Sequence, residues 1–369
     1  MSAVDAFEQL GGDFIRPDIV LEAAIPLELS GEAVRSRICT FSDHDGREWA
    51  LRPDLTLPVA IAEVGLRLEG IMGESLRRYD GPVFRLPRNA SDTIELRQTG
   101  FERFAAANGP VADATLYAAI CAGCMAEGVE RGSARFGDLA IFPAFVDALH
   151  LDPEITAGLK RAFRQEGGVR AFLDADRDGA ASGFARRLAG QSYEEVRAFV
   201  DDVFALTGTQ PIGERSIRDI SERLAELAAS RTAPDLSQGQ RDLIESFLCI
   251  DVPLPEAPSE MMRLATDSRV RGFEEFVSIL SDRIDALKSM TPVAFLEDAR
   301  FITRFGRRFT YYDGFVFDIS AENDGTGSFA MGGRYDSLLT NLSDGAVDVS
   351  AIGGVVVPSR LQRLAGRLK

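Results

Sequence analysis

FRLPRNASDTIELRQTGFE, residues 84–102, contains two stretches typical of strands around the turn-rich segment PRNASD. Runs rich in apolar and β-branched residues on either side of such a segment favour two strands joined by a turn. We therefore predict neighbouring strands from Gly81 to Leu86 and from Thr93 to Phe104. The second strand also carries Gln98 and Glu102, polar side chains that a core strand does not require.

The rest of the chain divides into mixed and helical parts. Strands at 36–41 and 47–52 flank SDHDG, whose Asp45-Gly46 step favours a hairpin turn. From His150 to about Leu287 the spacing of apolar residues is helical. The further predicted elements are helices from Leu55 to Leu68 and Ala112 to Glu130, and strands from Tyr311 to Ile319, Ser328 to Met331 and Ala351 to Val357.

Strands before and after a helical block predict an α+β fold, in which one antiparallel sheet flanked by helices is interrupted by an inserted helical domain. The predicted parts are residues 1–150 for the first part of the core, 151–290 for the insertion, and 291–369 for the second part of the core.

Composition restricts the kinds of protein this chain could be. With 45% hydrophobic and 27% charged residues, the 369-residue chain is an ordinary globular protein. It lacks an apolar run of about 18–20 residues and a basic leader followed by an apolar stretch, so we expect a cytoplasmic protein without a membrane span. A formal net charge of −16 argues against a tRNA or DNA partner, because nucleic-acid binding requires cations that neutralise phosphates.

Four cysteines in so long a chain do not form a disulfide framework, which indicates a reducing compartment. Cys121 and Cys124 have the spacing of a metal or redox pair, but they lie in a helix-like run and no second pair accompanies them. We interpret them as buried thiols and predict no metal site.

Four segments place polar residues on strands or strand ends. They are LRPDLTLP (51–58), FRLPRNASDTIELRQTGFE (84–102), RRFTYYDGFVF (307–317) and MGGRYDSL (331–338). Together they resemble the class II histidyl-tRNA synthetase core: LRPDLT is similar to that family's LRPEGT, FR…QTGFE to its motif 2, RRFTYY to its RGLDYY, and GGRYD is unchanged. The order is the same, and the family also carries a helical insertion. The resemblance implies a class II aminoacyl-tRNA-synthetase-like fold.

The resemblance also implies a histidine-binding pocket. A zwitterion with an imidazole ring needs an acid for its ammonium group, a guanidinium for its carboxylate, and a donor and an acceptor for its ring. The matching positions are Asp54, Thr56 and Gln98 for the ammonium group, Glu102 and Tyr312 for the ring, Tyr335 in the pocket lining, Arg307 for the carboxylate, and Arg85 as the motif 2 arginine.

The chain departs from the synthetases where ATP and tRNA would bind. Pro87 stands where motif 2 has an acid, and the following loop, normally basic, contains Asp92. The motif 3-like AIGGVVVPSRL keeps Arg360 but has Val357 in place of a glycine. Only nine residues follow Arg360, so we expect no anticodon-binding domain. No catalytic residue and no cofactor are predicted.

A group with these features is the histidyl-tRNA-synthetase-like family of ATP phosphoribosyltransferase regulatory subunits. That resemblance implies a non-catalytic partner of a short-form ATP phosphoribosyltransferase catalytic subunit, with L-histidine as feedback ligand. It also implies a homodimer within a hetero-oligomer, with motif 1 at Ile15 to Leu29. Three alternatives stay open: a truncated histidyl-tRNA-synthetase-like enzyme that activates histidine with ATP, a histidine sensor of another system, and a small-molecule enzyme with an unrelated reaction.

Overall fold

The computed structural model describes residues 1–88, 93–106, 109–165, 167–174, 191–207, 220, 221, 224, 236–305, 311–321 and 327–366. The chain forms two compact units, which are described separately. The first combines Met1–Ala144 with Ser246–Lys369, and the second is Phe145–Glu245.

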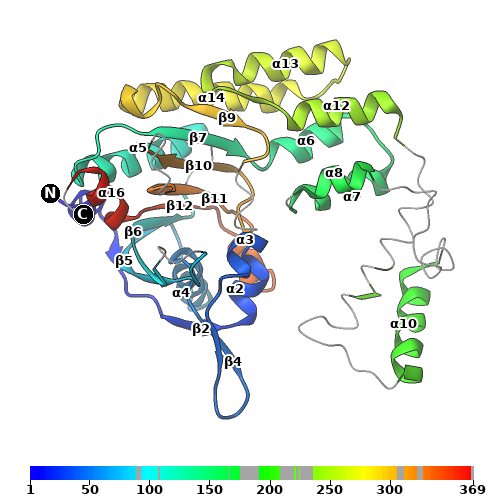
Figure 1. The fold of residues 1–369 in the computed structure, drawn as a ribbon, viewed down its shortest axis with the longest axis horizontal. Coiled ribbons are helices and arrows are strands. Elements are labelled where there is room, and N and C mark those ends of the chain that lie inside the picture. The colour runs from blue at the N-terminus through cyan, green and yellow to red at the C-terminus, as the bar shows by residue number, and fades with distance from the viewer. Residues whose placement is uncertain are drawn as a thin grey trace. The chain divides into compact units, whose positions relative to one another are not determined.

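A nine-stranded sheet in the order β1-β5-β6-β12-β11-β10-β7-β9-β8 forms the centre of the first unit (Figure 1). Among the described strands of this sheet, only the pairs β1–β5 and β7–β9 are parallel. The predicted α+β fold with a mainly antiparallel sheet is confirmed. Its strands are β1 (Asp13–Phe14), β5 (Ser75–Phe84), β6 (Glu95–Phe104), β7 (Ser133–Asp138), β8 (Asp251–Pro253), β9 (Arg300–Ile302), β10 (Phe315–Ser320), β11 (Ala330–Arg334) and β12 (Ala351–Val356).

The register of β5, β6 and β12 brings distant residues together. Glu102 of β6 lies opposite Arg77 of β5 on one side and Gly353 of β12 on the other. Since side chains alternate across a strand, Glu102 faces one side of the sheet and its neighbours Phe101 and Arg103 face the other.

Helices cover both faces of this sheet (Figure 1). On the Glu102 face, α4 (Thr56–Leu68) packs Leu57, Val59 and Val64 into a core with Tyr335 and Val355. The opposite face carries α1 (Ala3–Glu8), α5 (Pro110–Ala126) and, outside α5, α14 (Glu274–Met290). The remaining elements of the first unit are α2 (Ala24–Leu29), α3 (Glu32–Arg35), α13 (Ala257–Asp267), α15 (Leu338–Leu342), α16 (Pro358–Leu364) and short 3-10 turns at Leu254–Glu256 and Val293–Phe295.

A smaller sheet contains the predicted hairpin. Its order is β2-β4-β3, with β2 (Val20–Glu22), β3 (Thr40–Ser42) and β4 (Glu48–Leu51). The turn is closed by Asp43, whose Oδ1 accepts the Arg47 backbone N–H at 2.9 Å and whose Oδ2 accepts the Trp49 indole N–H at 2.9 Å. The hairpin leads directly into the segment LRPDLT that precedes α4.

Several elements differ from the predicted ones. The strand predicted from Gly81 begins six residues earlier, at Ser75. The prediction missed these residues because Arg77 and Arg78 interrupt the apolar pattern typical of a strand. Arg77 is accommodated in the strand because its Nε–H donates to the buried Glu63 carboxylate at 2.9 Å. Strand β7 was not predicted, and β8 lies inside the stretch predicted to be helical.

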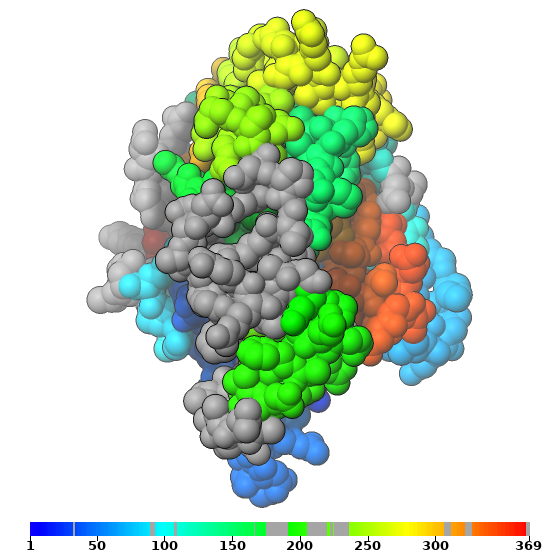
Figure 2. All heavy atoms as spheres, turned by 90° about the vertical axis from the view of Figure 1, so that its right-hand side faces the viewer, coloured from blue at the N-terminus to red at the C-terminus, as the bar shows by residue number. Residues whose placement is uncertain are grey.

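The second unit contains α7 (Pro153–Phe163), α8 (Gly168–Asp174) and α10 (Tyr193–Thr207), while α6 (Ile141–Ala148) and α12 (Gln238–Leu248) cross its boundaries. The expected insertion at 151–290 extends further than this unit, since α13 and α14 belong to the first one. The reason is that Arg283 of α14 donates to Asp113 of α5 at 2.8 Å and to Asp138 of β7 at 2.7 Å. Both helices form the yellow surface in Figure 2.

Within the described part of the chain, no helix combines the length and apolar character needed to cross a membrane.

Candidate functional site

Glu102 is the centre of a buried polar cluster on the α4 face of the sheet. Its side chain is fully buried, with 0% of the residue exposed. Oε1 accepts hydrogen bonds from the Thr56 hydroxyl at 2.7 Å and the Tyr79 hydroxyl at 2.6 Å, and Oε2 accepts one from the Tyr335 hydroxyl. Burial raises the pKa of Glu102 to about 7, although these three hydroxyl donors act to lower it. The Glu102 carboxyl group therefore titrates near neutral pH.

Asp54 lies beside this cluster, at the start of α4. Its Oδ1 accepts the Leu57 backbone N–H at 2.9 Å, so the carboxylate is held at a helix N-terminus. The residue is 3% exposed, and its Oδ2 has no hydrogen-bond partner among the described residues. Burial raises the Asp54 pKa, while the Leu57 N–H and the charge of Arg85 lower it. Asp54 thus offers one buried acceptor oxygen to a ligand.

Gln98 offers a second acceptor on the same face. It lies opposite Gly81 in β5, two alternate positions along β6 from Glu102. Gln98 is 4% exposed, and its Oε1 also has no hydrogen-bond partner in the described part of the chain. A buried acceptor without a donor is unfavourable by about 1–3 kcal/mol. A donor group bound here would relieve that cost.

Three tyrosine rings border the cluster. The rings of Tyr311 and Tyr312 have centroids 4.8 Å apart, and that of Tyr312 lies 6.1 Å from that of Tyr335 in an edge-on arrangement. Burial raises the pKa of all three hydroxyls, so they stay protonated and act as neutral groups at physiological pH. The rings restrict the space around Glu102 without adding charge.

Two glycines make room for these side chains. An added Cβ at Gly353 would overlap the Glu102 carboxylate. One at Gly333 would lie 2.6 Å from the Phe315 carbonyl oxygen and 3.0 Å from Cε1 of Tyr312. Neither glycine has a positive φ, so the requirement is space rather than backbone conformation. Sequence inspection did not single out Gly353 for this purpose.

The structure brings most of the predicted residues together. Arg85 follows β5, and its Nε donates to the Pro53 carbonyl oxygen at 2.7 Å. Arg307 lies outside the described residues. Tyr79 was not predicted as a site residue. The one feature of the sequence that indicates it is its position two residues before Gly81, which places both residues on the same face of the strand. The predicted residues that lie on this face are Asp54, Thr56, Gln98, Glu102, Tyr312 and Tyr335.

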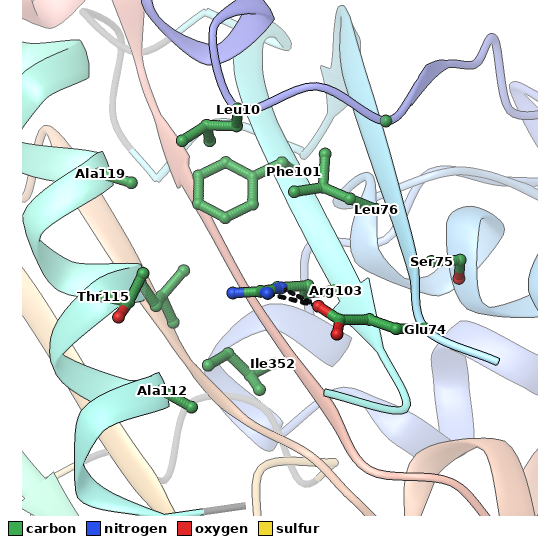
Figure 3. A pocket seen from close by; sticks show the side chains of 12 residues that line it. Leu10, Glu74, Ser75, Leu76, Phe101, Arg103, Ala112, Thr115, Ala119 and Ile352 are labelled. Carbon is green, nitrogen blue, oxygen red and sulfur yellow. Dashed lines mark hydrogen bonds and ion pairs between the residues drawn. The ribbon is translucent and has the colours of Figure 1, made fainter. Parts of the chain in front are cut away.

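A cavity of about 370 Å³ lies on the opposite face of the sheet (Figure 3). Its walls include Phe101, Leu76 and Ile352, together with α5. The cavity also contains a charged pair, in which Arg103 Nε–H donates to Glu74 Oε1 at 2.6 Å. Because both charges are already satisfied by one another, this cavity has no free group comparable to those around Glu102.

The described residues contain no group of three or more metal-ligating side chains. Cys121 and Cys124 are fully buried in α5, as predicted, and burial raises the pKa of both thiols. Arg360, from the motif 3-like segment, donates to the Ser328 carbonyl oxygen. The cluster around Glu102 is therefore the candidate site, and it is suited to binding a cationic polar ligand.

The family model for histidyl-tRNA synthetase matches residues 2–235. An ATP phosphoribosyltransferase regulatory subunit from Sinorhizobium medicae is 31% identical over 367 residues, covering 95% of this chain and 93% of that one. The protein of the same name from Rhizobium meliloti is 31% identical over 339 residues, covering 88% of this chain and 85% of the relative.

Two solved structures support the fold. An ATP phosphoribosyltransferase regulatory subunit/histidyl-tRNA synthetase from Bacillus halodurans has a TM-score of 0.64 at 17% identity, covering 100% of this chain and 77% of that one. Histidyl-tRNA synthetase from a Nostoc species has a TM-score of 0.60 at 16% identity, covering 100% of this chain and 71% of that one. By sequence and by fold, the chain belongs to the histidyl-tRNA-synthetase-like family of ATP phosphoribosyltransferase regulatory subunits.

Proposed function

We propose that this chain is a non-catalytic regulatory subunit that binds L-histidine at the Glu102 cluster. The observation that carries the proposal is the pair of buried oxygens, Asp54 Oδ2 and Gln98 Oε1, without a donor among the described residues. They lie on the same side of the sheet as an ionisable carboxyl group that three hydroxyls surround. An α-amino acid with a nitrogen-containing ring supplies donors for both ends of this cluster.

In the proposed complex, the ammonium group of histidine donates to Asp54 and Gln98, next to Thr56. The ring nitrogen donates to Glu102, with Tyr312 and Tyr335 beside the ring. The carboxylate meets a guanidinium, for which Arg85 and Arg307 are the candidates. The ammonium contacts satisfy two buried oxygens that have no donor among the described residues. Ligands that lack this donor group are therefore rejected.

The relatives are named regulatory subunits of ATP phosphoribosyltransferase, which supports a catalytic subunit as the partner of this chain. We propose that the chain assembles with a short-form ATP phosphoribosyltransferase catalytic subunit, which carries out the first step of histidine biosynthesis. It would support that activity and transmit inhibition by histidine, as a homodimer within a cytoplasmic hetero-oligomer that binds no tRNA. Inhibition requires that histidine bind one arrangement of the complex more tightly than another, because only differential affinity shifts an equilibrium.

The ligand is tested by isothermal titration of L-histidine into wild type and a Gln98→Met variant. Methionine keeps the size of the side chain and removes the acceptor, so we expect affinity to fall at least about tenfold. Gln238→Met, at an exposed position of α12, is the matched control and keeps wild-type affinity. Equal affinity for all three proteins contradicts the proposed site.

The partner is tested by mixing the chain with a short-form catalytic subunit and measuring phosphoribosyl transfer with and without histidine. We expect association, higher activity, and inhibition by histidine. The Gln98→Met variant should associate and activate equally while needing more histidine for inhibition. If the proteins neither associate nor show any effect of histidine, the regulatory function is refuted.

A second candidate is activation of histidine with ATP. The family model that matches is that of a synthetase, and the chain retains Arg85 and Arg360. Histidine-dependent exchange of pyrophosphate into ATP distinguishes the two candidates: a robust signal favours the enzyme, and its absence favours the regulatory subunit.

A further inference from the structure

Among the described residues, no cation pairs with the carboxylate of Glu102, which lies at the end of the cluster proposed to hold the ring. All three groups that donate to Glu102 are neutral hydroxyls, from Thr56, Tyr79 and Tyr335. Among the described residues, no Lys or Arg side chain forms an ion pair or hydrogen bond with Glu102. Burying an ionised carboxylate without a counter-charge is unfavourable, so this position favours a cation or a proton.

The arginine opposite Glu102 in β5 already forms two ion pairs. Arg77 lies directly opposite Glu102, but its guanidinium forms ion pairs with Glu63 at 2.9 Å and with Asp13. The nearby acid Asp54 adds negative charge and makes ionisation of Glu102 harder still. The titratable and charged groups around Glu102 in the described residues are Asp54, Arg77, Tyr79, Arg85, Tyr311, Tyr312 and Tyr335.

The hydrogen bonds of Glu102 leave it one acceptor position. A carboxylate has two oxygens with roughly four lone-pair positions in total. Oε1 accepts two hydroxyls, from Thr56 and Tyr79, whereas Oε2 accepts one, from Tyr335. The remaining position is on Oε2, so Glu102 can receive one further N–H.

We propose that the site binds histidine together with one proton, held between the imidazole and Glu102, so that the ring is recognised as an imidazolium paired with a carboxylate. This inference rests on the proposed function and adds the charge state of its ligand. Each charged group of the ligand then has one partner of opposite charge in the protein. The ammonium group pairs with Asp54, the ligand carboxylate with a guanidinium, and the imidazolium ring with Glu102. Ligand affinity then depends on pH through the pair as a unit.

The number of protons that the protein and ligand take up on binding changes sign with pH. The pKa of Glu102 is about 7 in the free protein, and that of a free imidazole is about 6.5. At pH 8 the two separate groups together carry about 0.1 proton, so forming a complex with one proton takes up about 0.9. At pH 6 they carry about 1.7 protons, so the same complex releases about 0.7. Binding is therefore tightest between these values.

The experiment is calorimetric titration of the full chain with L-histidine at pH 8 and pH 6, each in several buffers of different ionisation enthalpy. The dependence of the observed heat on buffer enthalpy gives the number of protons exchanged. We expect uptake at pH 8 and release at pH 6. Binding at pH 8 without proton uptake overturns the inference, because the ring would then be neutral beside an ionised Glu102. No binding at either pH refutes the proposed function itself, and the inference with it.

Tyr79 provides a second measurement with a matched control. Removing its hydroxyl in Tyr79→Phe takes one donor from the carboxylate and raises the pKa of Glu102. The pH at which the proton exchange crosses zero should therefore move upward. Tyr117→Phe removes another buried hydroxyl, which donates to the Phe295 carbonyl oxygen at 2.8 Å, and should leave the crossing unchanged. Equal crossings in both variants contradict a role for Tyr79 in positioning and ionising Glu102.

Discussion

Gly353→Ala is the substitution that tests most directly how β12 shapes the site. The added Cβ would overlap Oε2 of the Glu102 carboxylate and lie 2.8 Å from the Phe101 carbonyl oxygen. The carboxylate would have to retreat by about 2 Å to reach an ordinary contact distance. The oxygen that must move is Oε2, which accepts the Tyr335 hydroxyl and has the remaining acceptor position.

The expected cost combines two effects. Overpacking in a close-packed interior is unfavourable by about 1–3 kcal/mol. Losing a hydrogen bond to a charged group is unfavourable by about 1.5–3 kcal/mol. Partial relaxation of β12 reduces the sum, so we expect the free energy of unfolding to fall by about 3 kcal/mol. Since the displaced oxygen is the one proposed to meet the ring, histidine affinity should fall at least about 100-fold.

Urea unfolding followed by circular dichroism measures the first quantity, and calorimetric titration with histidine measures the second. Gly65→Ala is the control, because Gly65 lies in the exposed face of α4 and its added Cβ would meet nothing within 4 Å. That variant should be more stable by about 0.5–1 kcal/mol, since alanine favours a helix. If Gly353→Ala matches wild type in both stability and affinity, the close approach of β12 does not determine the position of Glu102.

Three further predictions concern stability and reactivity. Asp113→Ala should lower the free energy of unfolding by about 3–5 kcal/mol, measured by urea unfolding, because it leaves the buried arginines Arg283 and Arg334 without a shared carboxylate; an unchanged midpoint would contradict this. The pKa of Glu102 is raised from 4.5 to about 7, so the folded state binds more protons than the unfolded state between these values, and stability should decline as the pH rises through that window. Glu102→Gln should flatten this dependence, and equal slopes for both proteins would refute the assignment. Iodoacetamide should label the exposed Cys249 in the native protein before the two buried cysteines of α5, as peptide mass mapping would show.

Local sequence patterns determined the elements that depend on neighbours along the chain. Helix α4 follows from its apolar spacing and was predicted at Leu55 to Leu68, against the observed Thr56–Leu68. The apolar run at Ala351 predicted β12, whose residues are buried on both faces. Where charged residues satisfied distant partners, the same patterns failed, as in β5, whose start is hidden by Arg77 and Arg78.

The candidate site divides in the same way. The resemblance of the four polar segments to the synthetase motifs predicted that Asp54, Gln98, Glu102 and Tyr335 line one pocket. That Thr56 and Tyr335 both donate to one carboxylate was decided only by the tertiary structure.

The contributions of Tyr79 and Gly353 were also decided only by the tertiary structure. Both follow from the cross-strand register of β5, β6 and β12, which pairs residues up to 257 positions apart; Glu102 and Gly353 are 251 positions apart. A residue's own sequence neighbours carry no information about such a partner, because the register is set by the packing of the whole sheet against its helices. The sequence alone therefore predicted which groups form the candidate site, whereas the fold decided the hydrogen bonds of Glu102 and the space around it.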